Sequence, residues 1–416
     1  MPHAGVIRRG RLRAAAVVLL ATVLAGCVAV LSRNPVPSDR TAEAIVPGMP
    51  DVRAWAGRPD AAMERDFAAS FAQEMPGDFP AGPDGVVVYP HLAISGGGAN
   101  GAFGAGFLNG WTTTGKRPVF KVVTGVSTGA LMAPFAFVGP PYDKALRDFY
   151  TTTRTRDIFA VGSMLSLLGN VLSGDALADT GPLADLIDRH VDADILRAVA
   201  TAHARGRRLY IGTADLDSQQ FVVWNMGAIA SSVHPDAAAL FRRVMLASAS
   251  IPIAFPPVLF DVEVDGRRYD ELHVDGGVGA NVFLTGGVFR PLVLRNRAGL
   301  GPGRENIFII HNGQLVADPQ PTPRTVRGIA MRSLSASGRS AVIGDLFRIY
   351  TFTLREGAGF QWVTIGREVN LDGAETFDPE KMRELYDIGY QAALSGPQWI
   401  TMPPGAANRN PDSETP

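Results

Sequence analysis

The sequence predicts an α/β fold in which a mixed, mostly parallel sheet lies between layers of helices. Short apolar runs alternate with segments whose apolar residues recur at helical spacing, and no break in composition divides residues 86–395. Two predicted strands run directly into glycine-rich turns, at residues 95–101 and 125–129, and each turn opens a predicted helix. Parallel strands joined by right-handed crossovers are neighbours, so we expect both turns at the same end of the sheet.

The order of the elements follows from apolar spacing and from the positions of proline and glycine. Helices are expected at residues 61–75, 102–111, 128–137, 142–152, 164–172, 182–190, 193–204, 235–249, 325–350 and 379–395. One strand is expected from the apolar run 86–89 and 91–94, which Pro90 interrupts, and further strands at residues 122–124, 208–214, 220–225, 258–262, 268–274, 307–310 and 361–365. The apolar stretch 164–178 is interpreted as buried packing, with the lining of an acyl pocket or a lid as the alternative.

The most informative motif is Gly125-Val126-Ser127-Thr128-Gly129, a G-x-S-x-G sequence at a strand-to-helix turn. It is the pattern of a nucleophile elbow, in which a sharp turn lifts the serine hydroxyl out of the sheet edge. Gly125 and Gly129 remove side chains that would collide with the strand or the helix, and they permit unusual backbone angles. The turn also directs the N-terminus of the next helix at any negative charge that develops there. Taken alone, the motif also fits an ordinary glycine-rich turn.

The loop Ser95-Gly96-Gly97-Gly98-Ala99-Asn100-Gly101 joins another predicted strand to a helix. Glycine loops of this kind bind nucleotide phosphates, but this one matches neither G-x-G-x-x-G nor the Lys-Ser/Thr ending of a P-loop. The alternative is an oxyanion hole, because bare backbone N–H groups converge there and a substrate carbonyl can approach them closely. The G-x-S-x-G turn on the next strand favours this second interpretation.

A third motif, Asp275-Gly276-Gly277, ends the predicted strand 268–274. An aspartate in this position can hold its carboxylate over the sheet edge, although Asp-Gly is also common in surface turns. The stretch 247–257 precedes it and is rich in alanine, serine and proline, which forbids a helix or a central strand there.

These blocks, in this order, resemble the patatin-like phospholipases over roughly residues 91–283. The resemblance implies a three-layer fold and a catalytic dyad of Ser127 as nucleophile and Asp275 as base. It also implies that backbone N–H groups of the glycine loop form the oxyanion hole, and that neither a metal nor a cofactor is needed. The loop residues assigned to this role are Gly96, Gly97, Gly98 and Gly101. One departure is Asn100, since the family often has Lys or Arg at this place.

A Ser-Asp-His triad is the competing arrangement. His311 ends the apolar run 307–310 and would complete the order serine, aspartate, histidine along the chain. His273 shares strand parity with Asp275 and could point the same way. We favour the dyad, in which the Asp275 carboxylate takes the serine proton without an imidazole between them.

The leading functional hypothesis is a membrane-anchored serine lipid acyl hydrolase of the phospholipase A or lysophospholipase type, with a lipid or phospholipid as substrate. The same site would also suit a serine esterase or thioesterase that acts on soluble substrates. An envelope lipoprotein that binds lipid or protein without catalysis is a third hypothesis. The presence of Ser127, Asp275 and the whole glycine loop argues against this third hypothesis.

The N-terminus resembles the signal peptide of a bacterial lipoprotein. Four arginines between residues 8 and 13 precede the apolar run 14–25, which is too short to span a bilayer comfortably. Leu24-Ala25-Gly26-Cys27 resembles a lipobox, in which the cysteine receives a diacylglycerol and becomes the first residue after cleavage. Cys27 is the only cysteine of the chain, so no intramolecular disulfide can form. Residue 28 is Val rather than Asp, which favours the outer membrane over the inner membrane. We expect the protein on the periplasmic side of the outer membrane.

The predicted boundaries are a lipoprotein signal peptide at 1–26, a lipidated tether at 27–60, a patatin-like domain at 61–400 and a disordered tail at 401–416. The membrane partner is reached through the anchor at Cys27. A net charge of −1 over 416 residues argues against a nucleic-acid partner. The predicted helix 325–350 carries four arginines, interpreted as a solvated face with anionic head groups as the alternative partner: Arg327, Arg332, Arg339 and Arg348.

Overall fold

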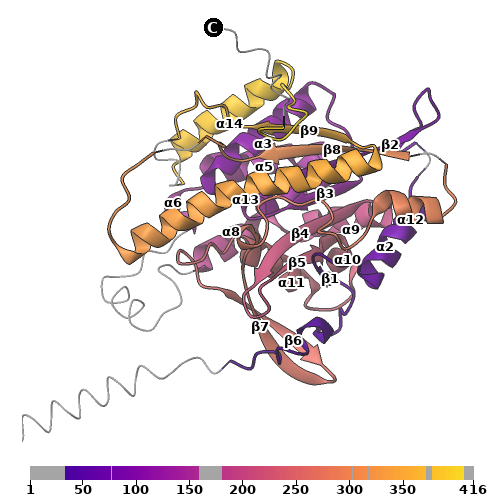
Figure 1. Cartoon of the computed structure of the whole chain (residues 1–416), viewed down its shortest axis with the longest axis horizontal. Coiled ribbons are helices and arrows are strands. Elements are labelled where there is room, and N and C mark those ends of the chain that lie inside the picture. Colours follow the sequence, from indigo (N-terminus) through magenta and orange to yellow (C-terminus); the bar gives the residue numbers. More distant parts are fainter. Residues whose placement is uncertain are drawn as a thin grey trace, which may run out of the picture.

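The computed structural model describes residues 33–75, 77–158, 180–301, 303–316, 319–371 and 377–406. Its centre is a nine-stranded sheet (Figure 1). The strands are β1 (Arg53–Trp55), β2 (Val87–Ile94), β3 (Val122–Gly125), β4 (Arg208–Asp215), β5 (Gln220–Asn225), β6 (Val258–Val264), β7 (Arg267–Asp275), β8 (Gly303–His311) and β9 (Gly359–Thr364).

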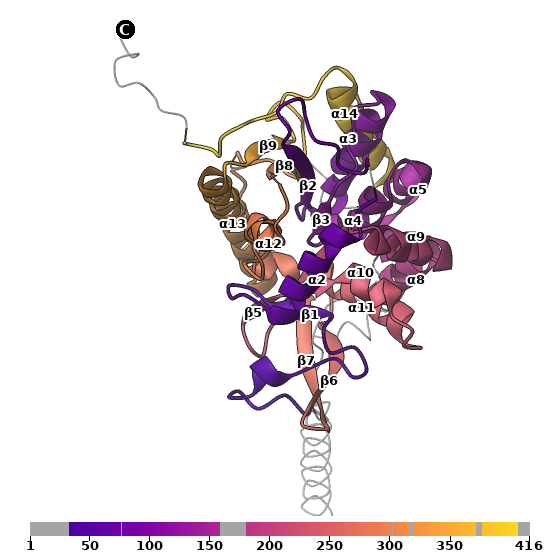
Figure 2. The same ribbon diagram turned by 90° about the vertical axis from the view of Figure 1, so that its right-hand side faces the viewer.

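Helices cover both faces of this sheet. The α-helices are α2 (Ala61–Ala72), α3 (Gly101–Thr113), α4 (Thr128–Val138), α5 (Asp143–Thr152), α6 (Thr155–Ile158), α8 (Gly181–His190), α9 (Ala193–Ala204), α10 (Met226–Ser231), α11 (Ala237–Ser248), α12 (Pro291–Arg297), α13 (Val326–Glu356) and α14 (Pro379–Leu394). Short 3-10 helices are η1 (Thr41–Glu43), η2 (Gly98–Asn100), η3 (Pro140–Tyr142) and η4 (Gly276–Val278). Helices α12 and α13 pack on one face, and α3, α4, α5, α8, α9 and α14 pack on the other (Figure 2).

The sheet has a parallel centre and an antiparallel edge. Its strand order is β1-β5-β4-β3-β2-β8-β9, and the pairs from β4 to β9 are all parallel. Strands β5 and β1 are added antiparallel at the β4 side, and β6 and β7 form an antiparallel hairpin. The predicted fold, a mixed sheet between two layers of helices, is therefore confirmed.

Strand β4 pairs with two different strands along one of its edges. Its first half pairs with β3, where Gly125 lies opposite Ile211. Beyond the end of β3, its last residues pair with β7, where Asp275 lies opposite Thr213. Because β3 runs parallel to β4 and β7 runs antiparallel to it, the C-terminal ends of β3 and β7 face each other.

Strand β2 contains Pro90, although proline is normally excluded from central strands because it has no N–H to donate. The pairing of β2 with β3 begins only at His91, opposite Val122. The carbonyl of Pro90 accepts a hydrogen bond from the N–H of Lys121 at 2.7 Å. Pro90 therefore lies at the start of the β3 pairing, and the apolar run forms a single strand, β2, as predicted.

Residues 33–60 pack on the domain, which corrects the prediction of a tether reaching to residue 60. Arg33 forms ion pairs of 2.6 Å with both Asp217 and Asp270. Further along, β1 adds an edge strand to the sheet next to β5. Composition rich in proline and arginine suggested a linker, but the partners of this segment lie far along the chain, where sequence patterns cannot reveal them.

Other differences from the predicted elements are small. Strand β8 begins earlier than expected and α13 ends later, and the short helices α10 and α12 were not predicted. The predicted helix 164–172, the signal peptide with Cys27, and residues 407–416 of the predicted tail lie outside the described residues. Within the described part of the chain, no helix is long and apolar enough to cross a bilayer.

Helices α3 and α14 approach each other at backbone distance. A Cβ atom on Gly106 would lie 1.9 Å from the carbonyl oxygen of Tyr386, and one on Gly389 would lie 2.0 Å from that of Phe103. Only glycine permits such an approach, because any side chain would overlap the facing backbone. This contact fixes α3, whose N-terminus follows directly from the glycine loop.

We predict that Gly106→Ala lowers the free energy of unfolding by about 1–3 kcal/mol, because the methyl group forces the two helices apart. Gly344→Ala is the matched control, since no atom lies within 4 Å of a Cβ atom at this position of α13. That control should be neutral or more stable by up to about 1 kcal/mol, because alanine favours helix. Urea unfolding followed by circular dichroism measures both. Equal stability of the two variants would contradict the close contact.

Candidate active site

Ser127 lies at the sharp turn between β3 and α4. Its φ angle is 55°, a conformation that non-glycine residues rarely adopt and that is typical of strained functional turns. A Cβ atom on Gly125 would lie 2.3 Å from the carbonyl oxygen of Gly129, and one on Gly129 would lie 2.4 Å from that of Ile94. Both glycines of the motif are therefore required by close backbone packing, as a nucleophile elbow demands.

Ser248 anchors this turn to β4. The backbone N–H of Ser127 donates a hydrogen bond of 3.0 Å to the Ser248 hydroxyl, which in turn donates one of 2.6 Å to the carbonyl of Gly212. All of these groups are buried, so an unpaired N–H at the strained turn would be costly. Ser248 was not predicted as a site residue, although it belongs to the serine- and proline-containing stretch that the sequence singled out.

Asp275 ends β7, so the pairing of both strands with β4 brings it toward Ser127. Its N–H donates to the carbonyl of Ser250 at 2.9 Å, and its Oδ1 accepts from the N–H of Gly277 at 2.7 Å. A Cβ atom on Gly276 would lie 2.4 Å from the carbonyl oxygen of Gly212. The Asp-Gly-Gly turn is therefore packed against the sheet end, and it is not a surface turn.

Asp275 is buried, with 5% of its surface exposed. Burial raises its pKa to about 6, and hydrogen bonding by the Ser127 hydroxyl and the Gly277 N–H opposes this rise in part. Its Oδ2 has no well-formed hydrogen bond with any described residue. The Ser127 hydroxyl is nevertheless near enough to this carboxyl group to favour its charged form.

The glycine loop passes beside the elbow. A Cβ atom on Gly96 would lie 3.1 Å from the Cβ atom of Ser127. The N–H of Gly96 donates to the carbonyl of Asn281 at 3.1 Å, and that of Gly101 is bonded at the start of α3. By contrast, the N–H groups of Gly97 and Gly98 have no hydrogen-bond acceptor among the described residues. Of the four predicted loop glycines, these two retain donors for a ligand.

Two asparagines hold the glycine loop, and the sequence did not indicate either of them. Asn281 accepts the Gly96 N–H and also donates through its side chain to the carbonyl of Gly277 at 3.3 Å. Asn312 donates from its side chain to the carbonyl of Ser95 at 3.0 Å, and its N–H donates to the Ser95 hydroxyl at 2.9 Å. Their only signals in the sequence are their positions, shortly after Asp-Gly-Gly and directly after β8.

Neither candidate histidine hydrogen-bonds to Ser127 or Asp275 in the described structure. His273 is buried within the sheet, where its Nδ1 lies 2.8 Å from the Thr213 hydroxyl and its Nε2 lies 3.2 Å from Glu271. The Nδ1 of His311 lies 2.9 Å from the hydroxyl of Thr364, and burial lowers its pKa to about 4. Both histidines are thus engaged with residues other than Ser127 and Asp275.

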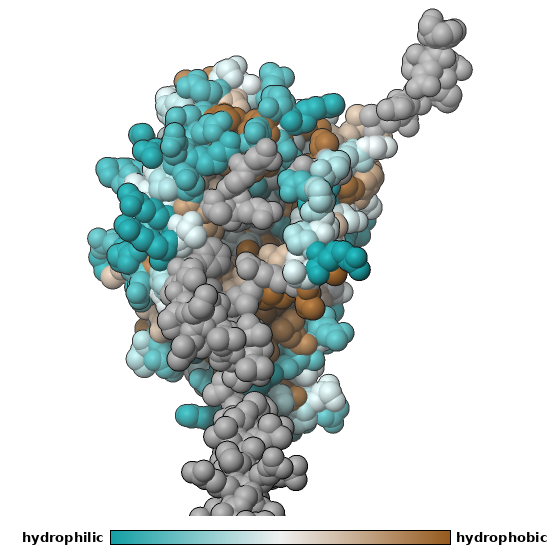
Figure 3. Space-filling model, turned by 90° about the vertical axis from the view of Figure 1, so that its left-hand side faces the viewer, coloured by the Kyte–Doolittle hydropathy of each residue, from teal (hydrophilic) through white to brown (hydrophobic). Residues whose placement is uncertain are grey.

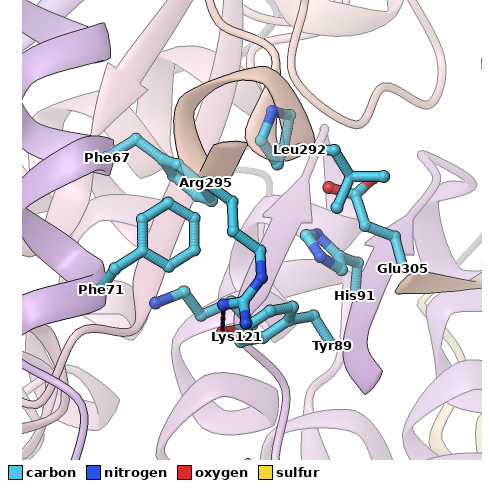
Figure 4. Close-up of a pocket in the computed structure, with 9 residues that line it drawn as sticks. Phe67, Phe71, Tyr89, His91, Lys121, Leu292, Arg295 and Glu305 are labelled. Carbon is cyan, nitrogen blue, oxygen red and sulfur yellow. Dashed lines mark hydrogen bonds between the residues drawn. The ribbon is translucent and has the colours of Figure 1, made fainter. Parts of the chain in front are cut away.

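A second polar cluster surrounds Lys121, at the other end of the parallel strands (Figure 4). Lys121 forms an ion pair of 2.5 Å with Glu74 and lies 4.9 Å from the ring centre of Phe71. Burial lowers the pKa of His91 to about 3 and raises that of Glu305 to about 8, so both are neutral at pH 7. The hollow between these side chains is too narrow to hold a water molecule. Its features are those of a packed core.

Metal binding has no evident site in the described part of the chain. No group of three or more His, Cys, Asp or Glu side chains lies there in a position to hold an ion. The polar groups that surround Ser127 are backbone amides, hydroxyls, carboxamides and the single carboxyl of Asp275. This set resembles the donors and bases of covalent ester chemistry.

The fold and the elbow define the class, an α/β domain with a serine at a strand-to-helix turn. Residues 92–286 match the model of the family described as Patatin-like phospholipase, and this span contains Ser127, Asp275 and the glycine loop. The chain therefore carries a patatin-like phospholipase domain, whose family is one of lipid acyl hydrolases. The predicted resemblance is confirmed.

Two solved structures give a weaker likeness. VipD from Legionella pneumophila is 12% identical, with a TM-score of 0.35 over 76% of this chain and 69% of that chain. The human GIVD cytosolic phospholipase A2 is 10% identical, with a TM-score of 0.32 over 76% of this chain and 55% of that chain. Among curated protein sequences, none matches the chain.

We predict that Asp275→Asn stabilises the protein relative to wild type, and that this gain in stability is larger at pH 8 than at pH 4. In the folded state the pKa is about 6, above the ordinary value of 3.8, so the buried charge costs free energy. This cost is absent below about pH 4, grows between about pH 4 and 6, and is complete above that range. The variant, which carries no charge, should gain about 1–3 kcal/mol at pH 8 relative to wild type. Urea unfolding at both pH values tests this, and an equal gain at both would contradict it.

Proposed function

We propose that the protein is a serine lipid acyl hydrolase of the phospholipase A or lysophospholipase type, acting through Ser127 and Asp275. The observation that carries the proposal is the meeting of the C-terminal ends of β3 and β7 beside β4. One end supplies a hydroxyl on a strained elbow, and the other supplies a buried carboxyl group with one free oxygen. The match to the patatin-like phospholipase family supports a fatty-acyl ester as substrate.

In the proposed first step, Ser127 Oγ attacks the carbonyl carbon of the ester while its proton passes to the Asp275 carboxylate. A serine hydroxyl is a weak nucleophile on its own, and the adjacent base activates it. Because the pKa of Asp275 is about 6, its base form predominates at neutral pH while it remains a stronger base than an exposed aspartate. The raised pKa thus suits proton transfer in both directions.

The negative charge that develops on the carbonyl oxygen needs donors beside Ser127. We assign this role to the free N–H groups of Gly97 and Gly98, with Gly96 and Gly101 giving space for the substrate and for packing against the elbow. The N-terminus of α4 adds a favourable dipole at the same place. Collapse of the tetrahedral intermediate returns the proton from Asp275 to the leaving alcohol and leaves an acyl group on Ser127.

In the proposed second step, Asp275 takes a proton from water as that water attacks the acyl-enzyme. The fatty acid leaves, and the proton returns to Ser127 Oγ. No group other than the dyad and the loop amides is needed for this sequence. The engagement of His273 with Glu271 and of His311 with Thr364 supports a dyad over a triad.

We predict that Ser127→Ala and Asp275→Asn each lower hydrolysis of a short-chain ester by about 10⁴-fold or more. The double variant should be little slower than either single variant, because residues that act as one unit cannot be lost twice. Steady-state kinetics on purified full-length protein measures the effect. Circular dichroism checks that each variant is folded.

The histidines provide the control for this experiment. His311→Ala and His273→Ala should each retain the rate within about tenfold, because neither imidazole lies on the proposed proton path. A folded histidine variant as slow as Ser127→Ala would refute the dyad.

Mass analysis of lipids after incubation with mixed bacterial phospholipids distinguishes a lipid hydrolase from an esterase or thioesterase of soluble substrates.

We further propose that the protein is a cell-envelope lipoprotein, anchored through Cys27 and located on the periplasmic side of the outer membrane. The lipobox sequence Leu24–Cys27 supports this localisation. Five residues, 28–32, lie between Cys27 and the ion-paired Arg33, a reach of about 20 Å at full extension. An anchor at Cys27 would therefore hold the domain close to the membrane.

We predict that Cys27→Ser prevents lipidation and leaves the precursor unprocessed or outside the lipoprotein pathway. Two or more acyl chains give stable anchoring, and the substituted residue cannot receive them. Detergent partitioning and the mass of the mature N-terminus measure the change. Finding an unmodified Cys27 in the wild-type protein would overturn this proposal, while the dyad proposal would be unaffected.

A further inference from the structure

Helix α13 packs on the sheet along only part of its length. It has 31 residues, and its C-terminal half packs on β8 and β9 through Val342, Leu346 and Ile349. None of its described side chains between residues 326 and 341 is buried. This N-terminal half therefore contributes little to the core, so packing does not account for its composition.

Apolar side chains on this half are unusually exposed. Val326 is 89% exposed, Ile329 is 54% exposed and Leu334 is 36% exposed. Single exposed apolar residues are common on proteins, but three on adjoining turns of one helix form a patch that calls for a partner. None of the three belongs to a core cluster of the described residues.

The charge of the same segment has a single sign. Residues 324–343 contain four arginines and no acidic residue, although the whole chain is nearly neutral. The next acidic residue, Asp345, is buried and accepts hydrogen bonds from the N–H groups of Asn281 and Val282. Exposed apolar side chains and positive charge are two of the features found in helices that bind at the surface of membranes.

The position of α13 links this surface to the candidate active site. The carbonyl of Gly338 accepts a hydrogen bond of 3.2 Å from the side chain of Asn281, whose own carbonyl holds Gly96 beside Ser127. Figure 3 shows the face at the C-terminal end of the parallel strands. Apolar side chains, in brown, gather to the right of its centre, on the side where α13 lies in the other views (Figure 1, Figure 2).

We propose that the N-terminal half of α13 docks on an anionic phospholipid surface and so presents the active site to lipid substrates. This inference rests on the proposed lipid hydrolase function. Val326, Ile329 and Leu334 enter the boundary between head groups and acyl chains, and Arg324 and Arg339 contact the head-group phosphates. A bilayer fits better than a protein partner, because the patch combines loosely spaced apolar groups with positive charge alone.

The test uses the full chain reconstituted into phosphatidylcholine vesicles with or without phosphatidylglycerol, and a soluble short-chain ester as the second substrate. Ile329→Glu should lower lipid hydrolysis in the anionic vesicles by about tenfold, because a charge replaces an apolar side chain that enters the bilayer. Its kcat/KM on the soluble ester should stay within about twofold. Val233→Glu is the matched control, since Val233 is fully exposed in the loop between α10 and α11 and should change neither rate.

A second measurement reports binding without catalysis. A polarity-sensitive dye is attached to Ile329→Cys and to Val233→Cys. Each variant also carries Ser127→Ala, so that it does not hydrolyse the lipid. Ser127→Ala protein treated with the same dye measures any labelling of Cys27. Moving from detergent into anionic vesicles should shift the emission of the dye at position 329 to the blue and leave that at position 233 unchanged. High salt should reduce the shift, because the arginine contribution is screened.

The outcomes separate the two proposals. A wild-type protein inactive on both substrates would refute the proposed function itself. A wild-type protein active on the ester, with equal vesicle rates for Ile329→Glu and wild type, would refute the docking alone. A dye at position 329 whose emission in anionic vesicles matches that of the dye at position 233 would also refute it, since neither position would then enter the bilayer.

Discussion

The pairing of β4 with two strands along one edge is the constraint on which the site depends. β3 runs up this edge to Gly125, and β7 runs down it to Asp275, with only Gly212 of β4 between the two registers. A shift of either register by one residue would turn the functional side chain to the other face of the sheet. The separation of Ser127 and Asp275 is thus set by backbone hydrogen bonds of the core, and it depends little on flexible loops.

Neighbouring residues stabilise Ser127 and Asp275, although the conformation of the first and the burial of the second cost free energy. A non-glycine residue with the φ angle of Ser127 costs on the order of 1–3 kcal/mol, and the buried carboxyl of Asp275 adds a further cost when ionised. The segment Ser248–Ser250 bonds to the backbone of both residues. Buried neighbours and these hydrogen bonds allow the domain to keep a site that a less rigid fold would relax.

Hydrogen bonds of Asn281 connect the site to helix α13 at the outside of the domain. Asn281 contacts the glycine loop, the Asp-Gly-Gly turn and α13, so a change at this helix can reach the Ser127 environment through three hydrogen bonds. Residues 33–60, which pack on the domain, leave a short distance to Cys27. A short anchor and an apolar, arginine-bearing helix would together limit the orientations of the domain on a membrane.

The sequence by itself determined the α/β class, the elbow at Ser127, the glycine loop and the Asp-Gly-Gly motif, because each rests on local backbone geometry that only certain residues permit. It did not indicate Ser248, Asn281 or Asn312, and it misjudged residues 33–60. These features arise from contacts between segments far apart in the chain, which depend on strand register and packing. Local patterns contain no information about those contacts, so only the tertiary structure decided which N–H groups of the glycine loop stay free and what holds the two strand ends together.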